Sequence, residues 1–169
     1  MVKKTLQNVV ELEENGVSVI RTIAVREKSH WNKGKCFGCP EDAAEFAKPL
    51  FENADKEYLV VCCLDGKSQP VSMEVVAVGM VNQCLVGMRE VFKNAILSNA
   101  VSIIVFHNHP SGDSHPSSSD LEISKKLRQA GILIGIEVLD HIVLGDDEFH
   151  SIANILNWDS WKENNVIIA

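Results

Sequence analysis

The chain has 169 residues and a formal net charge of -7 at pH 7, and 46% of its residues are hydrophobic. That length suits one domain able to bury roughly 70% of its unfolded surface, and no apolar run approaches the roughly 20 residues that cross a bilayer. We therefore expect a domain with no membrane contact, and the acidic balance gives no support for nucleic-acid binding, which depends on clustered Lys and Arg.

The N-terminal region begins with two lysines and then turns acidic, without the apolar core or small-residue cleavage site of a secretory signal. A cytoplasmic protein is therefore expected. Val17–Val25 (VSVIRTIAV) is rich in β-branched residues and predicts a strand, and the polar residues 26–35 predict a loop. Pro40 then opens a predicted helix, because proline and acidic residues are favoured in a first helical turn.

Two strands and a helix are predicted in the middle of the chain. Tyr58–Leu64 (YLVVCCL) is apolar throughout and is followed by Asp65-Gly66, which predicts a strand buried on both faces with a turn after it. Val71–Val81 is expected to be its hairpin partner. Apolar residues recur at i and i+4 in Arg89–Asn99, which predicts an amphipathic helix.

The last third of the chain continues the alternation of strands and helices. Val101–His107 (VSIIVFH) predicts a second fully buried strand, and Ser118–Ala130 predicts a helix with Gly131 just past its C-terminus. Ile132–Leu144 predicts further strand, and the tail at 158–165 is expected to be a surface helix or loop. This alternation predicts the α/β class, with helices on both faces of a mixed sheet.

One segment, HNHPSGDSHPSSSD at residues 107–120, carries the candidate chemistry. Residues i and i+2 of a strand point to the same face, so His107 and His109 can present two imidazoles side by side. Asp120 in the first turn of the next helix can supply a carboxylate. Two His and one carboxylate form a catalytic zinc set that leaves the fourth position for water, and zinc lowers the pKa of such a water to about 7. The predicted chemistry is hydrolysis.

A simpler interpretation of the same residues stays open. His-x-His pairs are common, and Ser117-x-x-Asp120 has the form of a capping box that begins a helix. On spacing alone, a metal site and a helix cap are about equally good explanations, and Asp120 can serve both.

The complete pattern resembles the JAMM (MPN+) metalloprotease motif, which consists of His107-x-His109, seven residues, Ser117, two residues and Asp120. The sequence HNHPSG at residues 107–112 is similar to that of the bacterial RadC branch of the family. Further similarities are MREVFKNAILSNA before the strand and Leu139-Asp140-His141 (LDH) after the next one, so the resemblance spans about residues 39–152.

The resemblance implies a fold and a set of roles. The fold is a three-layer α/β/α sandwich of the cytidine-deaminase-like (JAB/MPN) type, with one catalytic Zn2+ at the two histidines and Asp120. The family places a general base at the position of Glu57 and a hydroxyl that stabilises an oxyanion at Ser117. Asn108 and His141 are candidates for orienting the metal ligands. Two further carboxylates are reserve candidates for the base: Glu74 and Glu90.

The resemblance also divides the chain. Residues 39–152 form the metal-binding domain, 1–38 are expected to be a strand and loop that pack on or extend it, and 153–169 are a tail. Long RadC-type chains carry a helix-hairpin-helix region before the metal domain. Residues 1–38 leave no room for one, which weakens an inherited role in DNA repair and predicts a short form of the family.

Other chemistry-bearing residues have simpler explanations. The cysteines are odd in number and are expected to be reduced: Cys36, Cys39, Cys62, Cys63 and Cys84. The Cys36-x-x-Cys39 pair has the spacing of half a zinc site or a redox pair but lacks a second pair, and Cys62 and Cys63 are explained by core packing. His115 is expected to be an exposed loop residue or to reach substrate. The basic residues of one helix form a solvated face: Lys125, Lys126 and Arg128.

Three functions follow from these residues. The leading one is a zinc-dependent hydrolase of peptide or isopeptide bonds, with a peptide or protein as substrate. The alternative is a non-proteolytic module that keeps zinc for structure and binds DNA or protein in a DNA-repair-associated or mobile-element context. A nucleobase deaminase is the third, but its H-x-E and P-C-x-x-C signature is missing, because Pro40 follows the cysteine pair.

Overall fold

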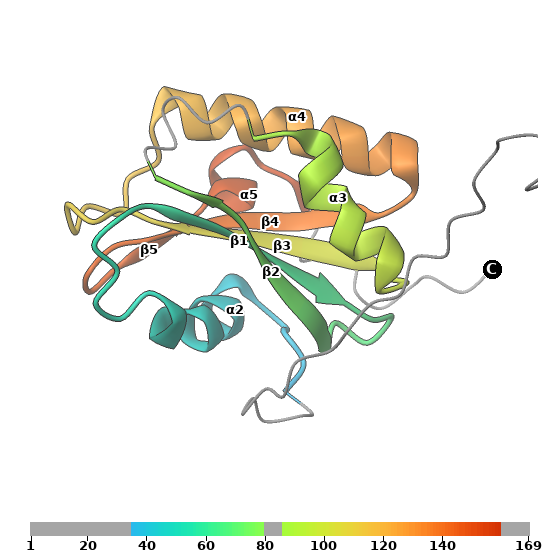
Figure 1. The fold of residues 1–169 in the computed structure, drawn as a ribbon, viewed down its shortest axis with the longest axis horizontal. Coiled ribbons are helices and arrows are strands. Elements are labelled where there is room, and N and C mark those ends of the chain that lie inside the picture. Colours follow the sequence, from blue (N-terminus) through green and yellow to red (C-terminus); the bar gives the residue numbers. More distant parts are fainter. Residues whose placement is uncertain (1–34, 80–85, 160–169) are drawn as a thin grey trace, which may run out of the picture.

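A five-stranded mixed sheet forms the centre of the molecule in the computed structural model, which describes residues 35–79 and 86–159 (Figure 1). The strand order is β2-β1-β3-β4-β5. β3 and β4 pair in parallel and the other neighbours pair antiparallel. The strands are β1 Tyr58–Leu64, β2 Pro70–Val78, β3 Ser102–Asn108, β4 Glu137–Leu144 and β5 Phe149–Ser151.

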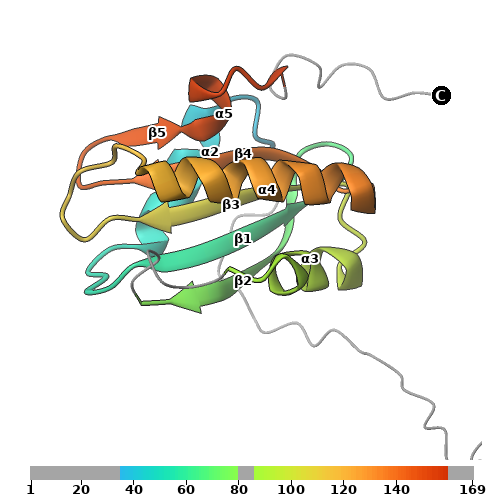
Figure 2. The ribbon, with the colours of Figure 1, turned by 90° about the horizontal axis from the view of Figure 1, so that it is seen from above.

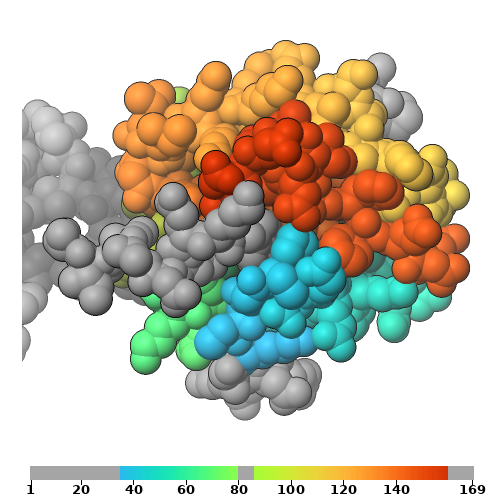
Figure 3. Space-filling model, turned by 180° about the vertical axis from the view of Figure 1, so that it is seen from behind, coloured from blue at the N-terminus to red at the C-terminus, as the bar shows by residue number. Residues whose placement is uncertain are grey.

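Helices cover both faces of this sheet. They are α2 Pro40–Ala47 with the short 3-10 helix η2 Lys48–Leu50, α3 Met88–Leu97, α4 Ser118–Ile134 and α5 Ile152–Ile155. α3 and α4 pack on one face and α2 packs on the other (Figures 1 and 2). From behind, α2 and the segment of α5 lie next to each other (Figure 3). The predicted α/β/α layering is confirmed.

The two central strands have apolar residues on both faces. In β1, Leu59 and Val61 pack with α3 and α4, whereas Val60 and Leu64 pack with α2. Every residue of β3 is buried. Continuous apolar runs are typical of such doubly covered strands, and the prediction that both are fully buried is confirmed, apart from the half-buried Tyr58 at the start of β1.

The end of α4 differs from the prediction. The helix does not stop before Gly131 but continues to Ile134 and ends at Gly135, whose φ of 77° is the left-handed conformation that favours glycine. A Cβ at Gly131 would lie only 2.5 Å from the Ile136 carbonyl oxygen, so this glycine lets β4 approach the helix. The predicted strand from Ile132 was wrong over its first residues, because a β-branched run at the helix end was interpreted as strand.

Some predictions lie outside the described residues, and two short elements were not predicted. Val17–Val25, nearly all of the loop at 26–35 and most of the tail at 158–165 are outside the described part of the chain. β5 and α5 have no strong pattern because they span only three and four residues. No helix among the described residues is long and apolar enough to cross a membrane.

Candidate metal centre

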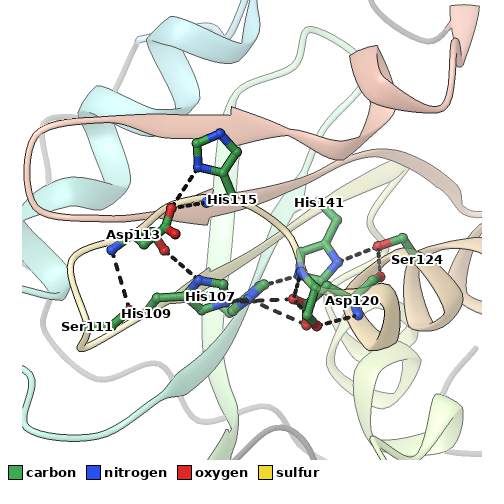
Figure 4. Close-up of polar contacts among 9 residues, drawn as sticks. His107, His109, Ser111, Asp113, His115, Asp120, Ser124 and His141 are labelled. Atoms are coloured by element: carbon green, nitrogen blue, oxygen red, sulfur yellow. Dashed lines mark hydrogen bonds and ion pairs between the residues drawn. The ribbon is translucent and has the colours of Figure 1, made fainter.

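Two histidines at the C-terminal end of β3 face each other. His107 is the penultimate residue of the strand and is fully buried, whereas His109 just beyond it has a side chain that is 16% exposed. Their Nε2 atoms lie 2.9 Å apart. The period of two along a strand explains why both rings point to the same side, toward α4 (Figure 4).

Asp120 completes the group from the first turn of α4. Its Oδ1 lies 3.6 Å from Nε2 of His107, and its Oδ2 lies 3.6 Å from Nε2 of His109. A full capping box fixes this turn, because the Ser117 hydroxyl accepts from the Asp120 N–H and the Asp120 carboxylate accepts from the Ser117 N–H. The cap and the candidate ligand role therefore coexist in one residue.

These three side chains could hold a metal ion. Their ligand atoms all lie within 4.8 Å of one another. Ligands of one tetrahedral zinc lie roughly 3.3–3.5 Å apart when each bond is about 2.0–2.2 Å, and the observed separations fall on both sides of that value. Small side-chain adjustments would therefore bring all three onto one ion, and the donor set fits zinc.

The 2.9 Å contact between the two Nε2 atoms constrains what lies between them. His109 Nδ1 lies 2.6 Å from the Asp113 carbonyl oxygen, which can only accept, so that nitrogen carries a proton. Nε2 of a neutral His109 is then a bare lone pair directed at the other ring. Two bare nitrogens at this distance repel each other unless a proton or a metal ion lies between them.

Burial and charge shift the pKa values of the group. Burial lowers the pKa of His107 to about 4, and Asp120 opposes this only in part. The Asp120 carboxylate raises the pKa of the more exposed His109. Burial alone would raise the pKa of Asp120, but contacts with the histidines and Ser117 outweigh it and hold the carboxyl ionised. The centre therefore has one carboxylate and one ring kept neutral.

Glu57 lies beside this group at the start of β1. Leu59 pairs with His107 in the antiparallel β1–β3 register, and continuing that register places Glu57 opposite His109. The charge of Glu57 contributes to the raised pKa of His109, which indicates that the carboxylate is within electrostatic range of the ring.

Asn108 holds the backbone on both sides of Glu57. Its Oδ1 accepts from the Tyr58 N–H at 2.8 Å, and its Nδ2 donates to the Lys56 carbonyl at 3.0 Å. Alternation along β3 directs this side chain away from the two histidines and toward β1. The residue between the two histidines thus fixes the segment that carries Glu57, rather than contacting the ligands through its side chain.

Ser117 donates its hydroxyl proton to Oδ2 of Asp120 at 2.6 Å. The structure therefore places this hydroxyl against the predicted carboxylate ligand. Glu74 and Glu90, the reserve bases, both pair with Lys93 and do not join the group.

The LDH segment on β4 contributes two buried side chains. Asp140 accepts from the Ser151 hydroxyl and from the Ala153 N–H, which anchors the start of α5. His141 Nε2 lies 2.8 Å from His107 Nδ1, and its Nδ1 lies 2.6 Å from the Ser124 hydroxyl. His141 thus contacts His107, one of the candidate ligands, and its role toward a metal ion stays a prediction. Ser124 was missed, although its i+4 spacing from Asp120 was visible in the sequence.

The remaining candidates lie apart from the centre. The Cys36 sulfur accepts a hydrogen bond from the Gln69 side chain, and Cys39 precedes α2. None of the four described cysteines forms a disulfide. Cys84 lies outside the described residues. His115 is exposed and bonded to the Asp113 carboxylate. Lys126 pairs with Glu122 on the same helix.

A hollow of about 360 Å³ lies on the α2 side of the sheet. Its lining includes Tyr58, Val60 and Met73, which pack with α2. The candidate ligands face the opposite side, toward α4, so this hollow is not part of the metal centre.

Comparison with known proteins gives one consistent result. The family model for the RadC-like JAB domain matches residues 37–157. The chain is 40% identical over 125 residues to a UPF0758 protein of Geobacillus thermodenitrificans, which covers 74% of this chain and 55% of that protein. It is 43% identical over 113 residues to a UPF0758 protein of Shouchella clausii, covering 67% and 49%, and 41% identical over 115 residues to one of Methanosarcina barkeri, covering 68% and 50%. The chain thus spans about half the length of these relatives.

Proposed function

Because the chain belongs to the RadC-like JAB domain family, which includes zinc hydrolases, we propose that it is a zinc-dependent hydrolase of peptide or isopeptide bonds. One observation carries the proposal: two imidazole nitrogens and one carboxylate converge within 4.8 Å at the end of a buried strand. A set of three protein ligands leaves a position for water or substrate, whereas structural zinc sites are usually closed by four.

In this proposal His107, His109 and Asp120 hold the ion. Zinc, when bound, supplies a Lewis acid that polarises a carbonyl and lowers the pKa of water from about 15.7 to about 7. A buried neutral ring at His107 and an ionised Asp120 are the protonation states that bind a divalent cation, and both are favoured by the pKa shifts of the folded chain.

Glu57 is proposed as the general base. Its carboxylate takes a proton from the attacking water as the water oxygen bonds to the carbonyl carbon, and it passes that proton to the leaving nitrogen as the C–N bond breaks. Two observations support this role. The strand register places Glu57 opposite His109, and the Asn108 side chain forms hydrogen bonds with the backbone on both sides of Glu57.

Ser117 is proposed to stabilise the oxyanion that forms at the carbonyl oxygen. Its hydroxyl now donates to Oδ2 of Asp120, so it would have to turn toward the substrate when that oxygen binds the ion. The short hydrogen bond keeps the hydroxyl beside the site where charge develops.

The first test is metal analysis of the purified chain beside Asp120→Asn. This variant keeps a side-chain oxygen for the helix cap but removes the charged ligand. We expect one equivalent of zinc in the wild type, little in the variant, and peptide or isopeptide cleavage that a chelator abolishes. A wild type with no bound metal would overturn the proposal. Stoichiometric zinc without cleavage across peptide and isopeptide libraries would favour a module that binds DNA or protein.

The second test separates the base from the ligands. Glu57→Gln should retain zinc and lose hydrolysis by roughly 100-fold or more, the usual contribution of positioned proton transfer. Glu74→Gln is the matched control, because that residue lies on β2 and pairs with Lys93. Full activity in Glu57→Gln would assign the base to another residue.

A further inference from the structure

Three hydrogen bonds and one longer contact join four residues into a ring that begins and ends at Asp120. The Ser124 hydroxyl bonds to the Asp120 carbonyl oxygen at 2.6 Å, His141 Nδ1 bonds to the Ser124 oxygen at 2.6 Å, and His107 Nδ1 bonds to His141 Nε2 at 2.8 Å. The last step returns to Asp120, whose Oδ1 lies 3.6 Å from His107 Nε2. Figure 4 shows this ring linking α4, β4 and β3.

The position of every proton in this ring follows from its first bond. A carbonyl oxygen can only accept, so Ser124 donates its single proton to Asp120. The Ser124 oxygen must then accept the proton of His141 Nδ1. A neutral His141 with a proton on Nδ1 has a bare Nε2, which can only accept the proton of His107 Nδ1. His107 is left with a bare Nε2, which lies 2.9 Å from His109 Nε2 and 3.6 Å from Asp120 Oδ1, so in the zinc-free chain it accepts the proton of His109 Nε2.

No solvent is available to break this order. Ser124, His141 and His107 are 0%, 1% and 0% exposed. A buried ring nitrogen that lost its partner would remain unpaired, which is costly in a low-dielectric interior. Both imidazoles are buried, and a neutral imidazole avoids the cost of placing a charge in that interior.

We propose that Ser124 and His141 are positioning residues that hold His107 in the tautomer with its proton on Nδ1, so that the Nε2 lone pair is presented to the metal ion. The inference deepens the proposed function, since the ion is the one bound there. Ligating histidines usually donate their other N–H to a carboxylate, a carbonyl or water. His107 instead reaches a carbonyl through a second imidazole and a hydroxyl, and that carbonyl belongs to another ligand residue.

The proposal predicts what removal of the hydroxyl does. Without Ser124, His141 can move its proton to Nε2 and donate to His107 Nδ1. His107 then carries its proton on Nε2, where it occupies the position of the metal. Ser124→Ala should therefore weaken zinc binding by roughly 10- to 100-fold, the usual effect of losing a group that orients a ligand.

A matched control is available at the end of β5. Ser151 is also buried and donates a 2.6 Å hydrogen bond, but to the Asp140 carboxylate, which is not part of the ring. Zinc affinity is measured by competition with a chelator for the wild type, Ser124→Ala and Ser151→Ala. We expect weakened binding in Ser124→Ala alone. Equal weakening in the two variants would overturn the proposal, since both lose a buried hydroxyl.

A second pair of variants separates orientation from packing. In His141→Gln the amide oxygen can accept from His107 and the amide N–H can donate to Ser124, so the direction of the ring is kept. His141→Leu retains bulk but neither function. Zinc affinity close to wild type in His141→Gln, with loss in His141→Leu, is expected. Loss in both, with folded proteins, would show that the ring direction does not account for binding.

The tautomer itself can be measured without zinc. Two-bond 1H–15N correlation spectra of the chelator-treated chain distinguish a proton on Nδ1 from one on Nε2 of His107. We expect Nδ1–H in the wild type and Nε2–H in Ser124→Ala. Nε2–H in the wild type would overturn the assignment. Because this readout needs neither zinc nor hydrolysis, it decides the role of the ring even if the proposed enzyme activity fails.

Discussion

The two histidines of the candidate centre direct their Nδ1 atoms to different kinds of partner. His107 is buried and its Nδ1 proton is directed by side chains from two other elements, His141 on β4 and Ser124 on α4. His109 is partly exposed, and its Nδ1 proton goes to the main-chain carbonyl of Asp113 in the same loop. Nε2 of each ring therefore faces the candidate metal position. His107 is oriented by buried side chains, and His109 is oriented by a main-chain carbonyl of its own loop.

This difference predicts how sensitive each candidate ligand is to substitution of its neighbours. A main-chain carbonyl is present whatever side chain occupies its residue, so the partner of His109 is insensitive to substitution. The partner of His107 depends on two particular side chains and on the docking of α4 against β4. We call His107, His141 and Ser124 the buried half of the centre, and His109 with the Asp113 carbonyl the loop half. Substitution in the buried half should change both metal binding and stability, whereas substitution in the loop half should mainly change metal binding.

Alanine at each histidine should give the strongest effects and separate the two halves. His107→Ala and His109→Ala should each weaken zinc binding beyond the roughly 100-fold that loss of an orienting residue can cause. Only His107→Ala should also lower the free energy of unfolding of zinc-free protein, by about 2–4 kcal/mol, because it leaves a cavity and removes the partner of the buried His141 Nε2. Urea unfolding in chelator measures this, and equal stability losses in both variants would contradict the comparison.

Acid should destabilise the zinc-free chain through the buried half. His107, with its pKa lowered to about 4, and His141, also lowered, stay neutral in the folded state, while the unfolded chain takes up protons at the ordinary value of 6.5. Stability is therefore complete above that value and falls as the pH decreases toward 4, by about 1.4 kcal/mol per pH unit for each proton. The raised pKa of His109 has the opposite effect and acts mainly above this window, because the stability that it contributes is present below 6.5 and is lost as the pH rises through its folded pKa.

Unfolding free energies measured at intervals between these two pH values test this. His141→Gln removes one of the two protons, so its slope should be about half that of the wild type. His115→Ala is the control, because that ring is exposed, and its slope should match the wild type. A wild-type slope of zero would contradict the neutral state of the buried rings.

The sequence could predict which three side chains converge but not the buried groups that contact them. Strand periodicity aligns His107 with His109, and the motif spacing brings in Asp120, so local pattern was sufficient there. The contact between His141 and His107 depends on the parallel register of β3 and β4, which pairs Val105 with His141 after an irregularity at Ile103/Ile104. No local pattern encodes that register.

The same limit explains two other features. Asn108 bonds to backbone groups about 50 residues earlier in the chain, a contact that only the folded sheet creates. At α4, Gly131 was predicted to follow the helix end, but the helix ends at Gly135. Gly131 proved to be the one needed for close packing against β4, and Gly135 the one with positive φ, a distinction that tertiary contact decides.

Asn108 extends the comparison to the side of the centre that faces β1. Asn108→Ala should leave zinc bound but reduce hydrolysis by roughly 10-fold, less than the roughly 100-fold or more expected when the base itself is lost, because the backbone around Glu57 loses both side-chain hydrogen bonds. Zinc content and kcat are measured together, with Glu57→Gln for reference. In the double variant the two losses should not add. Additive losses would indicate that Asn108 acts on something other than the base.

The smallest effect is expected at Asp113, and it is the most direct test of the difference between the two halves. Its carboxylate bonds to the N–H and Nδ1 of His115, at the exposed surface, while its main-chain carbonyl accepts from His109. Asp113→Asn should therefore leave zinc affinity close to wild type and change stability by no more than about 0.5 kcal/mol, the usual range for a surface substitution. Chelator competition beside Ser124→Ala compares the two directly. If Asp113→Asn weakened zinc binding as much as Ser124→Ala, the loop would depend on its side chains as the core does, and the two histidines would not be held by different means.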